Sequence, residues 1–526
     1  MSVSCERGFC FAGRHGNVPV PTAETPMSAP KDIILGIDQG TTNTKVVAID
    51  GQGVILGQAV RPITTTAPEP GFVEQDAEAM VANILACIGE LKERLSLRPA
   101  EILSLGIANQ TETLVVWDPE TGRPVMPAIV WQCRRGAEEL KALRNDDALR
   151  LVKARTGLDL DPTFTAAKLL WLKHHRPSIA ARLGNGSLRW GTVDSWLIFA
   201  LTEGKIYATE PGNAARTMLF DIDRIIWDPE LAALFGLDLA AFPECRTSHS
   251  GFGATSAALL GASIPITGVM GDQQAALFGH GCTKERELKI TYGTGAFLWM
   301  NAGTSPPPAP GDGIIRTIAW QIDQPCYAYE GFVMYAGKIL DWLAERLSIA
   351  GGGAAVAAEA EKAGTSAGAV LIPAFQGLAS PWWQPDMRAG LLGLSAATTR
   401  GHIAHAGLEA VCYQIRAVLE GIGDGRDQAM PIAKIDGSMT RSRYFTQLQA
   451  SVLSVPLFVS ASDAMTPFGS ALMAGLGAGR WQTLAELRDL PRAGERIEPA
   501  SASAYQASYE AWARAVNVLI AGYGRN

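Results

Sequence analysis

The stretch ILGIDQGTTNTKVVAID, residues 34–50, predicts a strand, a tight polar turn and a second strand. Its apolar flanks suit a buried sheet, and Gly40 lets the backbone turn sharply and approach a ligand closely because glycine has no Cβ. Successive backbone N–H groups in such a turn form a concavity that binds anions. The alternative is an ordinary β-hairpin whose turn residues are merely polar.

The polar residues of this turn suit a polyphosphate. Thr41, Thr42 and Asn43 supply hydroxyl and amide groups, and Lys45 adds an ammonium group. Asp38 stands where a strand would deliver a carboxylate to a metal ion bound by those phosphates. The turn is therefore a candidate phosphate site that needs a second element to complete it.

A second turn of the same kind lies at residues 288–300, where two apolar strands flank Gly293 and Thr294. The two Gly-Thr pairs are separated by about the length of a domain, not by the roughly 20–50 residues of a solenoid repeat. We therefore expect two related domains that each contribute one phosphate-facing hairpin. Two such hairpins facing each other across a cleft would hold a nucleoside triphosphate.

Two acidic residues, Asp272 and Glu112, lie at the ends of predicted apolar strands, where a carboxylate can face a ligand. A buried strand ends at Gly271, and a helix is predicted to begin with Asp272 at its cap. Asp is a favoured N-cap residue, so a purely structural role for Asp272 stays open. Glu112 lies between apolar strands at 102–108 and 114–117, where it is either exposed at a turn or aimed into a cleft.

The composition describes a globular protein of more than one domain. The chain has 526 residues, 47% of them hydrophobic, and this length favours two large domains with a ligand site between them. A formal net charge of −7 argues against nucleic-acid binding. No apolar run reaches the roughly 18 residues of a membrane helix. The eight cysteines include no Cys-x-x-Cys pair, which favours reduced thiols in a cytoplasmic protein.

Residues 1–30 differ from the rest of the chain. They contain several Gly and Pro residues and show neither apolar periodicity nor the apolar core of a secretory signal, so we expect a disordered tail. Met27 stands just before the patterned sequence, and translation starting there is an alternative to Met1.

Apolar spacing predicts helices at 77–97, 137–153 and 164–175, and a third strand at 128–135. A strand at 434–436 enters a turn at Gly437, where a nucleoside can approach the backbone. Residues 331–339 look like a P-loop, but five residues rather than four separate Gly331 from Gly337, and Ile339 replaces the metal-binding hydroxyl. We therefore exclude a P-loop.

Five motifs in this order resemble the FGGY carbohydrate kinases, and within them the glycerol kinases, over about residues 33–481. They are GIDQGTT at 36–42, GIANQ at 106–110, IVWQCRR at 129–135, GDQQAALFG at 271–279 and TYGTG at 291–295. The resemblance implies an α/β fold of two actin-like, ribonuclease-H-like ATPase domains flanking a catalytic cleft. We expect an N-terminal domain at 31–281 that binds substrate and a C-terminal domain at 282–526 that binds nucleotide.

By this resemblance Asp272 would be the general base that takes the proton of the substrate hydroxyl as it attacks the γ-phosphate of ATP. Asp38 and Asp272 would hold Mg²⁺. Lys45 stands where glycerol kinases usually have Arg, and Arg441 would stack on adenine. The full set implied for the nucleotide comprises Gly40, Thr41, Thr42, Asn43, Lys45, Gly293, Thr294, Gly437, Ser438 and Arg441.

The substrate pocket departs from the glycerol kinase pattern. Matching positions are Glu112, Trp131, Asp272, Gln273 and Phe297. Thr111 stands where the family has Arg, and Thr163 stands where it has Tyr. Both replacements shorten the side chain, so we predict a somewhat larger polyol or keto-sugar phosphorylated at a terminal hydroxyl.

Two other functions remain as alternatives: a pentulose-type sugar kinase and a non-catalytic nucleotide-dependent sensor with the actin fold. The sequence also leaves a homo-oligomer open.

Overall fold

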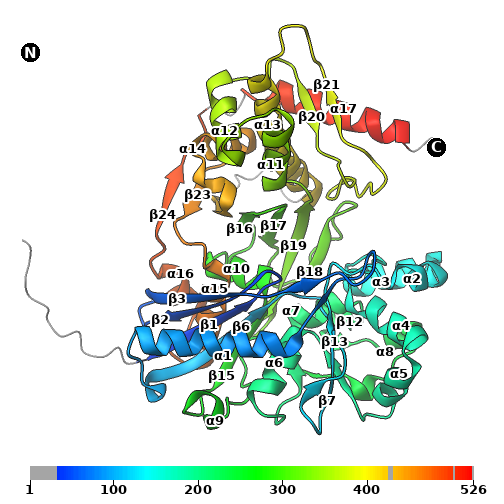
Figure 1. The fold of residues 1–526 in the computed structure, drawn as a ribbon, viewed down its shortest axis with the longest axis vertical. Coiled ribbons are helices and arrows are strands. Elements are labelled where there is room, and N and C mark those ends of the chain that lie inside the picture. The colour runs from blue at the N-terminus through cyan, green and yellow to red at the C-terminus, as the bar shows by residue number, and fades with distance from the viewer. Residues whose placement is uncertain (1–31, 424–430, 501–503, 524–526) are drawn as a thin grey trace, which may run out of the picture.

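The computed structural model describes residues 32–423, 431–500 and 504–523. These residues form two lobes, shown one above the other in Figure 1. The predicted tail at 1–30 lies outside the described residues.

The lower lobe is built on a five-stranded sheet with the order β15-β6-β1-β2-β3. Its strands are β1 (Ile33–Gln39), β2 (Asn43–Ile49), β3 (Ile55–Pro62), β6 (Ile102–Asn109) and β15 (Ile266–Gly271). Strand β1 runs antiparallel to β2, with Asp38 opposite Lys45, and parallel to β6. The stretch at 34–50 thus forms the predicted hairpin at the centre of this sheet.

The upper lobe repeats this arrangement in a seven-stranded sheet with the order β18-β19-β17-β16-β22-β23-β24. Strand β16 pairs antiparallel with β17 and parallel with β22, as β1 does with β2 and β6. The prediction of two related hairpins is therefore confirmed. The strands are β16 (Leu288–Tyr292), β17 (Ala296–Asn301), β18 (Ile315–Gln321), β19 (Pro325–Val333), β22 (Ala433–Gly437), β23 (Leu457–Ser460) and β24 (Gly494–Ile497).

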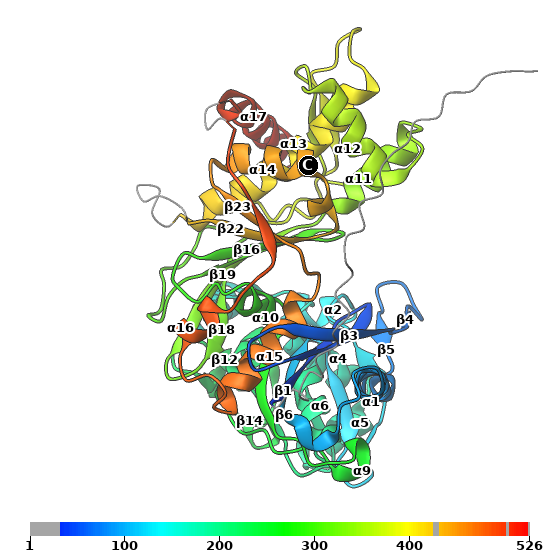
Figure 2. The ribbon, with the colours of Figure 1, turned by 90° about the vertical axis from the view of Figure 1, so that its left-hand side faces the viewer.

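Helix α15 (Met465–Gly477) crosses from the upper lobe and packs on the sheet of the lower one. Figure 2 shows it beside β1 and close to α10 (Asp272–Gly279). A row of glycines, Gly36, Gly106 and Gly268, lies in register across three strands beneath it. A Cβ at any of the three would overlap backbone atoms of α15, so the row permits this close approach. The segment after residue 282 therefore also helps to build the first lobe.

Helix α1 (Ala77–Arg94) covers the other face of the lower sheet, and Asp76 caps its N-terminus. The remaining helices of this lobe are α2 (Ala137–Leu143), α3 (Asp146–Thr156), α4 (Thr165–His175), α5 (Pro177–Gly184), α6 (Val193–Leu201), α7 (Pro211–Ala214), α8 (Pro229–Phe235) and α9 (Ala257–Leu260). Its short strands are β4 (Thr65–Thr66), β5 (Glu74–Gln75), β7 (Val115–Asp118), β8 (Arg123–Pro124), β9 (Ala128–Ile129), β10 (Arg189–Gly191), β11 (Ala208–Thr209), β12 (Phe220–Asp221), β13 (Ile226–Trp227) and β14 (Glu244–Cys245).

The upper sheet shares one hydrophobic core with the helices of its lobe. These helices are α11 (Gly337–Arg346), α12 (Gly352–Ala363), α13 (Arg400–Ile422), α14 (Arg443–Leu453) and α17 (Gln506–Tyr523), and a separate hairpin comprises β20 (Val370–Ile372) and β21 (Gly390–Leu392). Helix α16 (Leu484–Asp489) follows α15 and packs in the core between the lobes. No described helix is long and apolar enough to span a bilayer.

Local predictions were accurate for α1 and α4 and wrong in two places. The strand expected at 128–135 ends at Ile129, because the following residues form turns that close on the loop at 71–73. The helix expected at 137–153 is split, because Asn145 caps a new helix by accepting from the N–H of Ala148.

Candidate active site

Asp272 is the first residue of α10, directly after the buried strand β15, and Gly271 rather than Asp272 occupies the N-cap. The Oδ1 atom of Asp272 accepts a hydrogen bond of 2.7 Å from the backbone N–H of Gln273. Desolvation, together with the negative charges of Asp38 and Glu112, raises the pKa of Asp272 to about 7. A carboxylate with such a pKa is suited to accept a proton near neutral pH.

Asp38 lies near the end of β1 and is half-buried. Desolvation raises its pKa to about 7, although the nearby Lys45 ammonium acts in the opposite direction. The charge of Asp38 therefore opposes the ionisation of Asp272. A divalent cation would relieve this repulsion, so this pair fits Mg²⁺.

The described residues contain no group of three or more His, Cys, Asp and Glu side chains arranged to hold a metal ion. Mg²⁺ usually takes only one or two protein carboxylates and fills its other positions with phosphate oxygens and water. Two carboxylates beside the predicted phosphate site would thus be an adequate protein contribution to Mg²⁺ binding.

The first hairpin is tied to the aromatic residue predicted to bind substrate. The indole Nε1 of Trp131 donates a 2.8 Å hydrogen bond to the hydroxyl of Thr41, and that hydroxyl donates to Oε1 of Gln110 at 3.1 Å. The Thr41 hydroxyl proton is thus already used, which leaves the backbone of the turn to face an anion. The ammonium of Lys45 donates to the carbonyl oxygen of Asp463 at 3.2 Å, just before α15.

The second hairpin lies against the start of α11. The backbone N–H groups of Ala336 and Lys338 donate to the carbonyl of Thr294, and the N–H of Gly337 donates to the carbonyl of Gly293 at 2.9 Å. Residues 331–339, which are not a P-loop, therefore still place the N-terminus of α11 beside Gly293 and Thr294. The N-terminal end of a helix favours negative charge.

The predicted nucleoside turn lies next to this hairpin, because Gly437 pairs with Tyr292 across β22 and β16. Gly437 has φ of 101°, and a Cβ there would overlap the carbonyl oxygen of Tyr292, so only glycine fits. Ser438 and Arg441 follow in a short 3₁₀ helix (Ser438–Arg441), and both are exposed. The structure thus brings the predicted phosphate and nucleoside elements of the upper lobe together.

Glu112 is buried, and its backbone is in the left-handed region at φ of 63°, which is costly for a residue with a Cβ. Both of its carboxylate oxygens have donors within the protein. The hydroxyl of Thr111 donates to Oε2 at 2.7 Å, and Nε of Arg216 donates to Oε1 at 2.6 Å. Thr111, the replacement predicted to enlarge the pocket, therefore shares the Glu112 carboxylate with the guanidinium of Arg216, which comes from a distant part of the chain.

Arg216 was missed by the sequence analysis. Its side chain is 7% exposed, and it bridges Glu112 to Glu330 of the upper lobe, with 2.6 Å between Nη1 and Oε2 of Glu330. Burial alone would lower the pKa of Arg216, but the two carboxylates outweigh it and raise the pKa. The residue gives no sequence signal, because both partners lie more than one hundred positions away along the chain.

Lys289 was also missed, although a lysine inside the apolar strand β16 is unusual. It is fully buried, and its Nζ donates to Oε1 of Gln273 at 2.5 Å and to the hydroxyl of Thr291 at 3.1 Å. Because an ammonium group can only donate, the oxygen of the Gln273 amide must face Lys289. The NH₂ group is then left to donate to a substrate hydroxyl oxygen.

We expect Lys289→Met to raise the KM for the acceptor substrate, because the amide of Gln273 is no longer held in one orientation. The variant should also move the acid limb of the pH profile of kcat/KM to higher pH, because Lys289 lowers the pKa of Asp272. Steady-state kinetics across pH measure both effects. Lys284→Met, at an exposed lysine just before β16, is the control, and an unchanged profile for Lys289→Met would contradict this role.

Thr163 does not leave its hydroxyl free, because that group donates to Oδ1 of Asp161 at 2.6 Å. Asp161 is paired in turn with Arg134 at 3.0 Å. Beneath them the buried ammonium of Lys168 donates to the carbonyl of Thr163, and desolvation lowers the pKa of Lys168 to about 8. The buried ammonium of Lys168 therefore stabilises the loop that carries Thr163 at the predicted substrate site.

Phe297 is half-buried on β17 and stacks on Phe332 of β19, with ring centroids 4.6 Å apart. A buried hydrogen bond also joins the lobes, with 3.0 Å between Nε2 of His280, just after α10, and Oδ2 of Asp436 on β22. Together with the hydrogen bond from Lys289 to Gln273, this contact ties α10, which carries Asp272, to the upper sheet.

The raised pKa values predict a pH dependence with a defined sign. Asp272 must be ionised to accept a proton, so kcat/KM should fall as pH drops through about 7.

In the ligand-free protein the pKa values of Asp38 and Asp272 lie above the ordinary 3.8, so protonation favours the folded state. The contribution of these two groups to thermal stability should therefore increase as the pH falls from about 7 to about 4. Asp38→Asn should flatten this rise, and an equally steep rise in the variant would contradict the assignment.

Family models match almost the whole described chain. The N-terminal domain of the FGGY family of carbohydrate kinases matches residues 33–279, and the C-terminal domain matches residues 288–478. The chain belongs to the FGGY family of carbohydrate kinases. This membership makes the protein a kinase, and the two-lobed fold with paired hairpins is the FGGY kinase fold.

Relatives and solved structures agree with this family. The chain is 41% identical to a glycerol kinase of Thermus brockianus over 92% of this chain and 97% of the relative. It is also 41% identical to a glycerol kinase of Geobacter sp. (strain M21) over 86% of this chain and 92% of the relative. The structure of Plasmodium falciparum glycerol kinase with ADP matches with a TM-score of 0.88 at 30% identity, covering 93% of this chain and 98% of that one.

Proposed function

We propose that the protein transfers the γ-phosphate of ATP to a terminal hydroxyl of glycerol or of a somewhat larger polyol. One observation carries this proposal: a carboxylate with a raised pKa, Asp272, lies close enough to Glu112 and Asp38 to feel their charges, and Trp131 is hydrogen-bonded to Thr41 in the hairpin that carries Asp38. A base next to a polyol site and a phosphate site has the parts that phosphoryl transfer to an alcohol requires.

In the proposed reaction the substrate hydroxyl gives its proton to the Asp272 carboxylate while its oxygen forms a bond to the γ-phosphorus. The bond between the γ-phosphorus and the bridging oxygen of ATP breaks, and ADP leaves. The carboxylate of Glu112 would accept from other substrate hydroxyls, and the amide NH₂ of Gln273 would donate to them. Trp131 and Phe297 would cover the carbon chain.

The protein contributes positioning and charge compensation to this transfer. The hairpins around Gly40 and Gly293 would hold the phosphates from opposite lobes, and the turn at Gly437 would receive the nucleoside. Mg²⁺, when bound by Asp38 and Asp272, would neutralise charge on the phosphates. The relatives named glycerol kinase and the neighbour solved with ADP support this assignment.

Two observations bear on the size of the polyol. The short side chains of Thr111 and Thr163 leave more room than Arg and Tyr would, which favours a longer carbon chain. Arg216 restores a guanidinium next to Glu112, which preserves a charged wall like that of a glycerol site. We therefore propose that the site accepts glycerol and also polyols or keto-sugars of four and five carbons.

A substrate panel with the full-length protein tests this proposal. ADP release is measured with glycerol, erythritol, xylitol and xylulose, and we expect kcat/KM for a four- or five-carbon substrate to equal or exceed that for glycerol. Thr111→Arg should shift the preference towards glycerol. A clear preference of the unaltered protein for glycerol would overturn the larger substrate but not the kinase. ADP release that responds to none of them would overturn the polyol kinase proposal.

Other properties stay predictions. A cytoplasmic location was expected from the sparse cysteines, and a homo-oligomer was left open by the sequence. Size-exclusion chromatography with light scattering measures the oligomeric state directly.

A further inference from the structure

Two buried glutamines, Gln75 and Gln110, hold the turn of the first hairpin, although neither belongs to the predicted substrate or nucleotide sites. Gln75 is the last residue of β5, Gln110 directly follows β6, and each is only 1% exposed. A buried side-chain amide needs partners for its oxygen and for its NH₂ group. Both glutamines find such partners in each other and in Thr41.

The indole of Trp131 fixes the direction of the bonds in this group. Its Nε1 can only donate, so the hydroxyl oxygen of Thr41 accepts from it at 2.8 Å, and the single hydroxyl proton goes to Oε1 of Gln110 at 3.1 Å. The NH₂ group of Gln110 then donates to Oε1 of Gln75 at 2.7 Å, and that of Gln75 donates to the backbone carbonyl of Thr41 at 2.6 Å. These bonds form a closed ring through Thr41, Gln110 and Gln75, which we call the glutamine ring.

The glutamine ring uses a backbone acceptor of the turn and leaves backbone donors unpaired. The carbonyl of Thr41 accepts from Gln75, and the carbonyl of Thr42 accepts from the N–H of Ile63 at 3.0 Å. In the part of the chain that the structure describes, the N–H groups of Thr41 and Thr42 donate to no protein acceptor. The C=O and N–H of one trans peptide point in opposite directions, so Gln75 holds the N–H of Thr42 on the face of the turn away from itself.

This turn lies close to the proposed base. Asp38 belongs to the same hairpin, and its charge acts on Asp272. A phosphate group bound by the turn near the base would therefore be the γ-phosphoryl group that is transferred. Unpaired N–H groups of successive residues are suited to bind such an anion, provided that the backbone is held in one orientation.

We infer that Gln75 and Gln110 are positioning residues for phosphoryl transfer, because they orient the peptide between Thr41 and Thr42 so that its N–H donates to the transferring phosphoryl group. Both act through the backbone of the turn and not by contact with a reactant. Because Trp131 donates into the same ring, the indole predicted to cover the substrate and the phosphate turn form one hydrogen-bonded unit. This inference rests on the proposed kinase reaction.

Gln75→Met tests the ring, since methionine has a similar length but no amide. We expect kcat for polyol-dependent ADP release by the full-length protein to fall by at least about tenfold, because a donor to the transition state loses its orientation. The Kd of ADP, measured by calorimetry, should change by less than about twofold, because ADP lacks the transferred group. A merely structural role would weaken both properties together.

Gln110→Met opens the same ring at another bond, so it should lower kcat to a similar degree. The double variant should then be no slower than the slower single variant, because a ring that is already open cannot be opened again. Losses that multiply in the double variant would mean that the two glutamines act independently, and they would overturn the ring.

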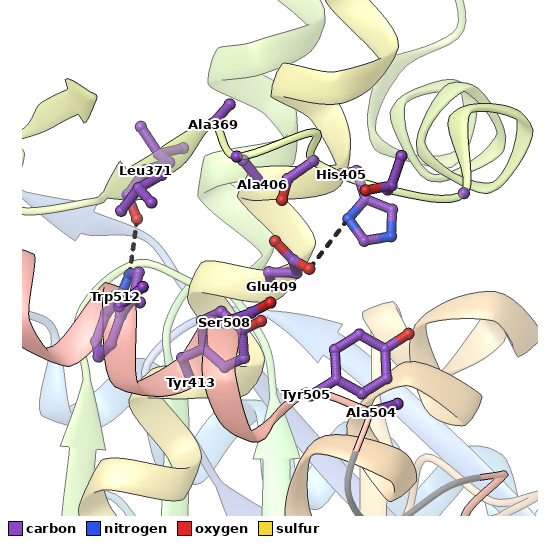
Figure 3. A pocket seen from close by; sticks show the side chains of 16 residues that line it. Ala369, Leu371, His405, Ala406, Glu409, Tyr413, Ala504, Tyr505, Ser508 and Trp512 are labelled. Atoms are coloured by element: carbon purple, nitrogen blue, oxygen red, sulfur yellow. Dashed lines mark hydrogen bonds and ion pairs between the residues drawn. The ribbon is translucent and has the colours of Figure 1, made fainter. Parts of the chain in front are cut away.

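Gln414→Met is the matched control. Gln414 is 3% exposed on α13, and its NH₂ group donates to the carbonyl of Ala410 in the same helix. Other residues of α13, Glu409 and Tyr413 among them, line a separate pocket of the upper lobe, shown in Figure 3, to which no residue of the glutamine ring contributes. This substitution also removes a buried amide, but it should leave kcat unchanged.

Circular dichroism and thermal unfolding report whether each variant is folded. If Gln75→Met does not fold, Gln110→Met still decides the outcome. Full kcat in these variants, in a protein that releases ADP in response to a polyol, would overturn the inference and leave the kinase assignment intact. A fall in kcat matched by an equal loss of ADP affinity would overturn it as well. Absence of polyol-dependent ADP release in the unaltered protein would overturn the proposed function itself.

Discussion

Replacing Asp272 with Asn is expected to lower kcat for phosphoryl transfer by about 10²- to 10⁴-fold, the usual contribution of a positioned general base. The amide has nearly the same shape but cannot take the proton of the attacking hydroxyl. The KM for the polyol should change much less, since Glu112 and Gln273 still contact it in the proposed site. Polyol-dependent ADP release measured under saturating ATP gives both constants.

Asp50→Asn is the matched control. Asp50 lies in a turn of the same sheet and accepts from the backbone N–H groups of Gln52 and Val54, so the substitution changes a carboxylate outside the proposed site. Full polyol-dependent ADP release by Asp272→Asn would contradict the assignment of the base. Absence of any polyol-dependent release, in the unaltered protein as well, would instead favour a nucleotide-dependent sensor.

Replacing Arg216 with Met is expected to destabilise the protein by about 3–5 kcal/mol, because two buried carboxylates lose their shared cation. The side chains of Arg216, Glu112 and Glu330 are each only 7% exposed, so solvent cannot take over the role of the guanidinium. The KM for the polyol should also rise, since Glu112 loses the donor that holds its Oε1 atom. Thermal unfolding followed by calorimetry, and polyol kinetics below the transition, measure the two effects.

Arg496→Met is the comparison for this change. Arg496 also pairs with a glutamate, Glu498, but both side chains are 61% exposed, so its loss should cost little. Adding Glu330→Gln to Arg216→Met should recover part of the lost stability, because one of the two unpaired charges is removed. If Arg216→Met unfolds at the same temperature as Arg496→Met and keeps its KM, the bridge between the lobes contributes nothing measurable to stability.

The paired hairpins were predictable because their signals are local. An apolar run, a Gly-Thr turn and a second apolar run specify a β-hairpin within about 15 residues, and the order of five motifs placed Asp272 in a known family. Lys289 left a weaker signal, a charge inside an apolar strand, whose meaning depends on Gln273 on the facing element. The errors at 128–135 and 137–153 came from turn and cap residues that overrode the apolar pattern.

The sequence by itself determined the duplicated α/β architecture and the two Gly-Thr hairpins, since each is encoded in a few consecutive residues, and its resemblance to the FGGY kinases supplied the proposed base. Only the tertiary structure decided what surrounds that base. It brings Arg216 from a distant loop to Glu112 and Glu330, and it packs α15 from the end of the chain onto the first sheet over Gly36, Gly106 and Gly268. Ion pairs and close packing form between residues that meet only after folding, so a linear pattern cannot display them.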